Sequence, residues 1–141
     1  MIYLDTSFIV PLVIAEVSSA AVEALVLKVK SGDLATSLWT PIEIASLVAR
    51  KVRMGELSAG EADAVRGEFH KILHESFSVI LPTAADFDTA RAYLETPKTS
   101  LRAGDAFHLA ISANHSARKI WSLDQGFIKA GKQLKLPVSA G

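Results

Sequence analysis

Short apolar runs alternate along the chain with longer segments in which apolar residues recur at helical spacing. The apolar runs predict strands over residues 1–4, 34–39, 76–82 and 119–123, with a possible fifth strand within residues 134–139. Because these runs are short and almost wholly apolar, we expect helices to cover both faces of a parallel sheet. The alternation therefore predicts an α/β fold, a three-layer α/β/α arrangement with a central parallel sheet of four to five strands.

Helix boundaries are marked by capping signals. Thr40 and Pro41 suit the N-cap and first position of a helix, and Ser58 with Glu61 suits a capping box. The segment from residue 8 reads as a short helix followed by a longer one that ends near Gly32. Together these signals predict helices within residues 8–32, 40–55, 58–75, 83–95 and 100–115, and a short helical turn over 124–131.

The composition narrows the class of protein. A chain of 141 residues that is half hydrophobic and 21% charged favours one domain, over residues 1–141, with one packed core. The absence of cysteine excludes disulfides, Cys-ligated zinc and thiol catalysis. The apolar stretches are too short to span a bilayer and no signal peptide is evident, so we expect a cytoplasmic protein without a membrane partner.

Four acidic residues fall where such a fold places its ligands. Asp5 ends the first apolar run and Asp124 directly follows the fourth, while Glu43 lies in the first turn after the second. Ligands bind at the carboxyl ends of parallel strands, so these three are expected at one sheet edge. Asp105 lies early in the helix before the fourth strand, and we expect it to reach that edge only if the loop 96–100 allows it.

A cluster of carboxylates suits a hard divalent cation such as Mg²⁺ or Mn²⁺. Without a cation, two such charges about 4 Å apart repel by about 4 kcal/mol at an effective dielectric constant near 20. A bound cation removes that repulsion, lowers the pKa of a coordinated water and stabilises charge on a phosphate. Since formal net charge is zero, affinity for nucleic acid would come from local charges or from the metal. Hydrolysis of a nucleic-acid backbone is the reaction this chemistry favours.

Each acidic residue also has a purely structural interpretation. Asp5 could bond the start of the next helix, and Asp124 could cap a helix or turn. Asp105 could favour the positive end of its helix dipole. Glu43 could complete a capping box with Thr40, an interpretation that its spacing supports as well as a catalytic one.

Other polar residues are weaker candidates. Lys98 and Arg102, near Asp105, could contact substrate phosphates. The basic cluster Arg50, Lys51 and Arg53 is either a solvated helix face or a surface that binds the phosphate backbone of a nucleic acid. His108 lies one helical turn after Asp105 and could be a proton shuttle or a partner of the site, although a buried core or interface histidine is the favoured interpretation. The two tryptophans, Trp39 ending the second strand and Trp121 within the fourth, could stack a base, but packing on the sheet is favoured.

Four stretches carry a resemblance to a known family. They are "MIYLDTSFIVPL", "TPIEIASLVAR" with Glu43, "LRAGDAFHLAISA" with Asp105, and "IWSLDQGF" with Ser122 and Asp124. In this order and spacing the chain resembles PIN domains, and specifically the VapC-type toxins of toxin–antitoxin pairs. Carried over by position, Asp5, Glu43, Asp105 and Asp124 match the acidic metal-site residues, and Thr6, Ser7 and Ser122 match the hydroxyl residues around them.

The resemblance implies a Mg²⁺- or Mn²⁺-dependent endoribonuclease that cuts structured RNA, tRNA or rRNA. It also implies two partners, a small cognate antitoxin and a second copy of the chain in a homodimer. We expect Asp5, Asp105 and Asp124 to contact the cation, with Glu43 acting through water. The alternative is a non-catalytic metal-binding α/β module that binds a partner protein. A phosphatase that forms a phosphoaspartate is disfavoured, because Ser7 stands where a second aspartate would be needed.

Overall fold

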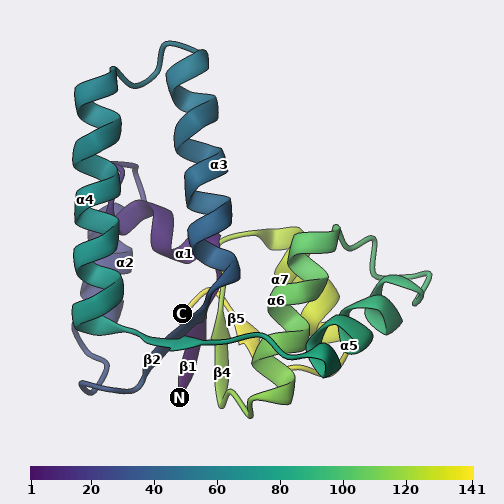
Figure 1. Cartoon of the computed structure of the whole chain (residues 1–141). Helices are drawn as coiled ribbons and strands as arrows, with labels where there is room; N and C mark the ends of the chain where they lie inside the picture. Colours follow the sequence, from purple (N-terminus) through teal and green to yellow (C-terminus); the bar gives the residue numbers. More distant parts are fainter.

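The computed structural model describes residues 1–141, in which strands and helices alternate through most of the chain (Figure 1). The strands are β1 (Ile2–Leu4), β2 (Leu34–Ser37), β3 (Ser78–Ile80), β4 (Lys119–Trp121) and β5 (Val138–Ser139). The helices are α1 (Thr6–Ile9), the 3₁₀ helix η1 (Val10–Leu12), α2 (Ser19–Val26), α3 (Trp39–Arg53), α4 (Ala59–Ser76), α5 (Ala84–Leu94), α6 (Ala103–Asn114) and α7 (Gln125–Gln133).

The five strands form one parallel sheet in the order β3-β2-β1-β4-β5. This confirms the predicted α/β fold with a parallel sheet of up to five strands. The expectation that every strand is covered on both sides is wrong for β3, where Ser78 and Val79 are exposed. As an edge strand, β3 pairs with β2 alone and has fewer neighbours to bury its side chains.

Helices cover the two faces of the sheet as separate layers, each with its own apolar core. One core joins α1, η1, α2, α3 and α4 to Leu4 and Trp121, and the other joins α5, α6 and α7 to Tyr3 and Ile120. Adjacent residues of β1 and of β4 thus point to opposite faces, as the two-residue period of a strand requires. In Figure 1, α3 and α4 form an antiparallel pair that projects away from the sheet on one side, with α5 to α7 on the other.

Two helix boundaries differ from the sequence-based prediction. The helix expected to continue to Gly32 ends at Val26, because after Leu27 the amides bond three rather than four residues back, Lys28 to Leu25 and Val29 to Val26. The last helix, α7, is longer than the predicted turn and extends to Gln133. The capping box of Ser58 and Glu61 at the start of α4 is present.

The predicted N-cap at Thr40 is wrong. Helix α3 already begins at Trp39, which was expected to end a strand, and its N-cap residue Leu38 makes no side-chain cap. Thr40 is instead fully buried, and its hydroxyl pairs with that of Thr36 in β2 at 2.7 Å. Because Thr40 lies inside the helix rather than at its N-cap, the predicted capping box between Thr40 and Glu43 does not form.

None of the helices combines the length and the hydrophobicity that crossing a bilayer requires.

Candidate active site

The site lies where the order of the sheet reverses. From β1 the chain first builds outward to β2 and β3, and later returns to add β4 and β5 on the other side. The carboxyl ends of β1 and β4 are therefore adjacent, at the position where α/β sheets bind ligands. Asp5 follows β1 and Asp124 lies three residues after β4, so the topology brings these two carboxylates to one place.

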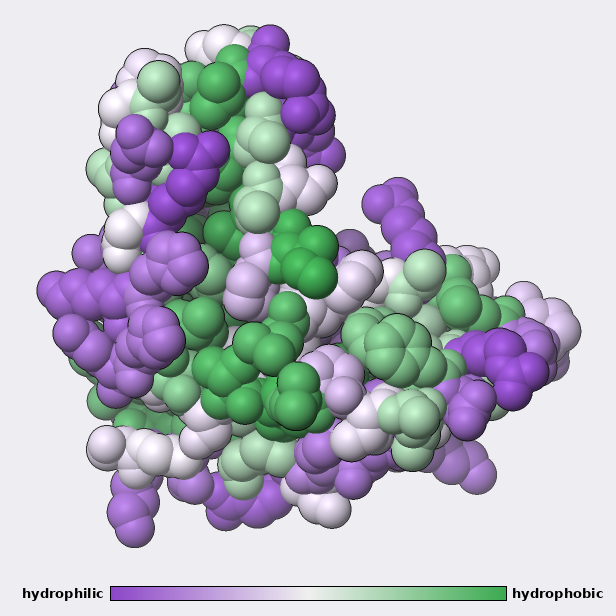
Figure 2. Space-filling model, viewed as in Figure 1, coloured by the Kyte–Doolittle hydropathy of each residue, from purple (hydrophilic) through white to green (hydrophobic).

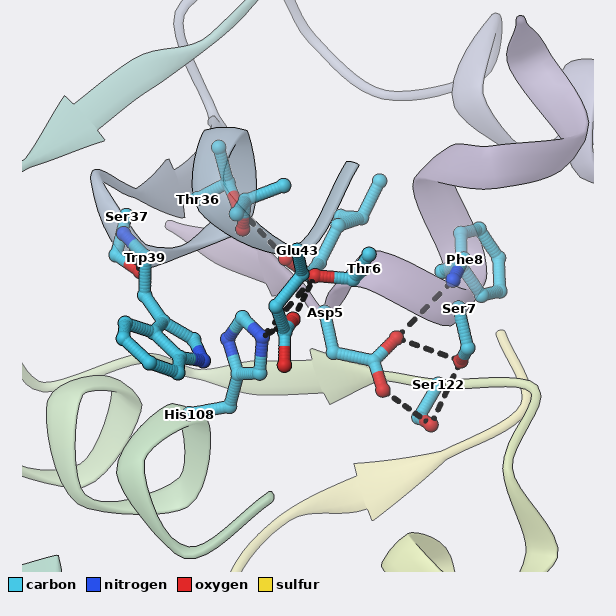
Figure 3. A network of polar contacts seen from close by, with 12 residues as sticks. Asp5, Thr6, Ser7, Phe8, Thr36, Ser37, Trp39, Glu43, His108 and Ser122 are labelled. Carbon is cyan, nitrogen blue, oxygen red and sulfur yellow. Dashed lines mark hydrogen bonds and ion pairs between the residues drawn. The ribbon is translucent and has the colours of Figure 1, made fainter. Parts of the chain in front are cut away.

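Asp5 is only 4% exposed, and both of its oxygens accept hydrogen bonds (Figure 3). Oδ1 accepts from the Phe8 amide at 3.0 Å and the Ser7 hydroxyl at 2.7 Å, and Oδ2 accepts from the Ser122 hydroxyl at 2.7 Å. Asp5 is thus the N-cap of α1, in line with its structural interpretation. Burial nevertheless raises the pKa of Asp5 above its ordinary value, so these bonds do not fully compensate its charge.

The hydroxyls predicted to surround the site tie its two loops together. The Ser7 and Ser122 hydroxyls lie 3.1 Å apart, which links the loop after β1 to the loop after β4. Each also accepts a backbone amide of the second loop, Ser7 from Leu123 at 2.9 Å and Ser122 from Asp124 at 3.0 Å. Asp124 in turn caps α7, with Oδ1 accepting from the Phe127 amide at 2.9 Å.

Asp105 reaches the same edge by helix direction rather than by loop length. Helix α6 ends at Asn114, a few residues before β4 begins, and therefore runs back along the sheet antiparallel to the strands. Its first turn, which holds Asp105, consequently lies at the carboxyl edge. Burial raises the pKa of Asp105, and the charges of Asp124, Asp5 and Glu43 raise it further, against an opposing effect of His108. All four predicted acidic residues thus lie at one edge of the sheet, near enough for Asp105 to be influenced by the charges of the other three.

Glu43 is turned away from the start of its own helix and toward α1 and α6. Its Oε2 accepts hydrogen bonds from the Thr6 hydroxyl and from Nε2 of His108, the latter at 2.7 Å. Burial alone would raise the pKa of Glu43, but the hydrogen bond and charge of His108, with help from Thr6, hold that pKa below its ordinary value. The capping-box interpretation of Glu43 is therefore wrong, and Glu43 is an ionised acceptor within the site.

His108 is a residue that the sequence alone could not assign. It is buried, at 2% exposure, as expected for a core histidine, yet both ring nitrogens have polar partners, and Nε2 bonds to Glu43 of the site. Nδ1 lies 2.7 Å from the Tyr3 hydroxyl, and that hydroxyl donates to Ser37 at 2.9 Å. A buried chain of polar groups therefore runs from β2 through β1 and α6 to Glu43, as Figure 3 shows in part.

Basic residues border the acidic site on the side of α3. A pocket of about 400 Å³ is lined by Asp124 and Ser7 at one end and by Arg50 and Lys51 at the other. Lys51 forms an ion pair with Glu56 at 2.8 Å, whereas Arg50 forms none. Lys98 and Arg102, the predicted phosphate contacts near Asp105, are exposed residues outside this pocket, although Arg102 occupies the N-cap position of α6.

A second pocket, of about 230 Å³, is almost entirely apolar and lies between the start of α3 and the helices α5 and α6. Trp39 and Phe107 form its floor, packed edge to face at 5.5 Å, and the exposed Phe87 and Leu94 border it. Figure 2 shows hydrophobic surface over the start of α3 and the adjoining part of the molecule. The other tryptophan, Trp121, packs against Phe8 in the core, as predicted.

The donor set fits a hard divalent cation in kind, although the ligands are not drawn together as a coordination shell. No three of the histidine and acidic side chains are arranged to hold a metal. Asp5 and Asp124 each direct one oxygen to a helix amide. Burial is the main cause of the raised pKa of Asp5 and of Asp105, and at Asp105 the charges of the neighbouring carboxylates add to it. Mg²⁺ or Mn²⁺ would bind such carboxylate oxygens and would favour their ionised form.

Comparison with known proteins agrees with this architecture. One solved structure that shares the fold is Mycobacterium tuberculosis VapC20, a toxin that cleaves the sarcin–ricin loop; it is 19% identical, with 93% of this chain and 95% of that chain covered and a TM-score of 0.71. FitAcB from Neisseria gonorrhoeae is 23% identical, with 98% of this chain and 96% of that chain covered and a TM-score of 0.70. FitAB bound to an IR36 DNA fragment is 21% identical, with 99% of this chain and 94% of that chain covered and a TM-score of 0.73. A comparison with curated protein sequences gave no match. The family model of the PIN domain matches residues 2–133. With its parallel sheet and the acidic edge between β1 and β4, this chain belongs to the PIN domain family.

Proposed function

We propose that this protein is a Mg²⁺- or Mn²⁺-dependent endoribonuclease and the toxin of a toxin–antitoxin pair. The observation that carries the proposal is the electrostatic contact of Asp105 with Asp124, Asp5 and Glu43 at the switch point of the sheet. Burial and the charges of three neighbouring carboxylates together raise the pKa of Asp105, and a bound cation would favour its ionised form. A pocket of that kind repels a phosphodiester until the cation is present, so a bound ion makes the site suitable for phosphate substrates.

Each residue has a distinct role in the proposal. Asp5, Asp105 and Asp124 hold the cation, which would supply Lewis-acid stabilisation of the phosphate and a coordinated water of lowered pKa. Glu43 remains ionised because its pKa is depressed, so it can accept a proton from the attacking water. The hydroxyls of Ser7 and Ser122 hold Asp5, and Thr6 holds Glu43.

Structured RNA, tRNA or rRNA, is the proposed substrate. The relative VapC20 cleaves the sarcin–ricin loop, and the fold of this chain matches it closely over nearly all of both chains. Arg50 and Lys51 line the pocket that begins at Asp124, and there they can neutralise phosphates next to the scissile one. Lys98 and Arg102 are the proposed contacts on the opposite side, near the first turn of α6.

A small antitoxin and a second copy of the chain are the proposed partners, in the cytoplasm. The relatives FitAB and FitAcB, described above, support a partnership of this kind. The apolar pocket bordered by Phe87 and Leu94 supports a homodimer, because exposed apolar surface of this kind is typical of protein interfaces. Light scattering of the purified protein tests the dimer, and replacement of Phe87 with lysine is expected to yield monomers.

A non-catalytic module that binds metal and a partner protein is the second candidate. It is favoured by one observation: Asp5 and Asp124 already serve as helix N-caps, a structural role that needs no reaction. The two candidates differ in whether RNA is cut.

The deciding experiment is incubation of total cellular RNA with purified, antitoxin-free protein in Mg²⁺, in Mn²⁺ and in EDTA. Asp5→Asn and Asp105→Asn serve as variants of the site, and Asp63→Asn, on the exposed face of α4, is the matched control. Discrete fragments that require metal, persist in the control and disappear in both site variants support the nuclease. Intact RNA in every metal-loaded reaction would favour the binding module.

A further inference from the structure

The hydrogen bonds of Glu43 are unevenly distributed over its two oxygens. Both Thr6 and His108 bond to Oε2, whereas Oε1 lies on the side of Gly104 at the start of α6. A Cβ atom at position 104 would come within 2.6 Å of Oε1, so the carboxylate is closely confined there as well. Glu43 thus has Oε2 committed to Thr6 and His108, while Oε1 faces Gly104 and the Trp39 indole, which also helps to lower the pKa of Glu43.

Of the two donors to Oε2, His108 is the one whose side chain is buried and rigidly held. A carboxylate can only accept, so Nε2 of His108 carries the proton of this 2.7 Å bond. The ring cannot rotate freely, because Nδ1 is paired with the Tyr3 hydroxyl at 2.7 Å, and Tyr3 is fully buried in β1. Tyr3 is fixed in turn by Ser37 of β2. Glu43 is therefore anchored, through His108, to two central strands of the sheet.

We propose that His108 is a positioning residue for the reaction, which acts by holding the carboxylate of Glu43 in the orientation from which it accepts a proton from the attacking water. This inference rests on the proposed nuclease function and extends it to a residue outside the acidic set. A histidine that only filled the core would need neither the bond to Glu43 nor the chain through Tyr3 and Ser37. Partners of this kind orient the groups that act on substrate, and their loss typically costs about 10- to 100-fold in activity.

Two substitutions at this position separate positioning from packing. His108→Leu fills the same space in the core with an apolar side chain of similar size and removes the donor to Glu43. His108→Gln keeps an N–H donor that can reach Oε2. His115→Leu is the matched control, because His115 lies just after the same helix and contacts another carboxylate, that of Asp86 at 3.2 Å, away from the site.

The kinetic arm measures kcat and KM on the RNA that the wild-type protein cleaves. His108→Leu is expected to lose about 10- to 100-fold in kcat with KM unchanged. His108→Gln is expected to recover most of that loss, and His115→Leu to match the wild type. In the background of Glu43→Gln, His108→Leu is expected to add little, because the two residues act as a unit. Full activity of His108→Leu, or an equal further loss in the Glu43→Gln background, would overturn the proposal.

The structural arm does not depend on activity. Crystal structures of the metal-free variants are expected to show Glu43 released from its wild-type rotamer in His108→Leu and returned to it in His108→Gln. An unmoved Glu43 in His108→Leu would overturn the positioning role, even in an active enzyme. If the wild type cuts no RNA while Glu43 is released as expected, the proposed nuclease fails and the positioning of Glu43 by His108 stands.

Discussion

Gly104 offers a sharp test of whether the placement of Glu43 matters. It lies in the first turn of α6, and a Cβ atom added there would meet Oε1 of Glu43 at 2.6 Å and Nε1 of Trp39 at 3.3 Å. Ordinary contact begins near 3.4 Å, so Gly104→Ala must displace Oε1 by about 0.8 Å. The carboxylate cannot simply retreat, since Oε2 is held by Thr6 and His108.

The expected result is a large loss of activity with little loss of stability. A displacement of about 1 Å at a reacting group can cost about 100-fold in rate. Alanine meanwhile gains about 0.5–1 kcal/mol over glycine within a helix, which offsets part of the strain. Cleavage rates and thermal unfolding, measured on the same preparation, separate the two effects.

Gly60→Ala and Gly67→Ala are matched controls. Both glycines lie in α4, and an added Cβ atom at either position meets nothing within 4 Å. Both variants are expected to be slightly more stable than the wild type, by about 0.5–1 kcal/mol each, and fully active. Full activity of Gly104→Ala would refute the reasoning, because it would show that the reaction tolerates a displaced Glu43.

Three further predictions concern charge. The pKa of Asp105 is raised in the folded state, so its contribution to stability is full below the unfolded-state pKa and is lost as pH rises through the folded-state pKa. Asp105→Asn is therefore expected to raise the melting temperature at pH 7 without Mn²⁺. A lower melting temperature would contradict this. Protonation of Asp5 and Asp105 removes metal ligands, so Mn²⁺ affinity is expected to weaken as pH falls through their raised pKa values. Electron paramagnetic resonance follows this loss, which is expected at a higher pH than for a site of carboxylates with ordinary pKa values. Arg50→Gln is expected to weaken RNA binding and reduce its salt slope by about 1, whereas Arg66→Gln on α4 leaves both unchanged.

The sequence predicted the sheet well because its strands are apolar runs set between strong helical patterns. It could not show that β3 lies at an edge, since strand order depends on packing between segments far apart in the chain. Local capping rules succeeded for Ser58 and Glu61, which are exposed, and failed for Thr40, whose hydroxyl is buried against Thr36. A capping rule describes the first turn of a helix in water and does not account for a hydroxyl on the neighbouring strand.

The acidic residues were predictable to different degrees. Asp5 and Asp124 follow from the rule for strand ends, while Asp105 needed a second rule, that a helix between parallel strands runs antiparallel to them. Glu43 was ambiguous, because its spacing from Thr40 fits a capping box equally well. For His108 the sequence favoured a core histidine over a partner of the site. It could not show the bonds to Glu43 and Tyr3, because these residues lie 65 and 105 positions away in the chain.

The central claim is that Asp5, Asp105 and Asp124 hold a divalent cation at the carboxyl edge of the sheet. The most direct measurement is anomalous diffraction from crystals of the wild-type protein soaked in Mn²⁺, beside crystals of Asp105→Asn treated identically. The account predicts an anomalous peak among the three carboxylates in the wild type and a weaker peak or none in the variant. A wild-type map without a peak there, at a Mn²⁺ concentration that saturates other carboxylate sites, would contradict it.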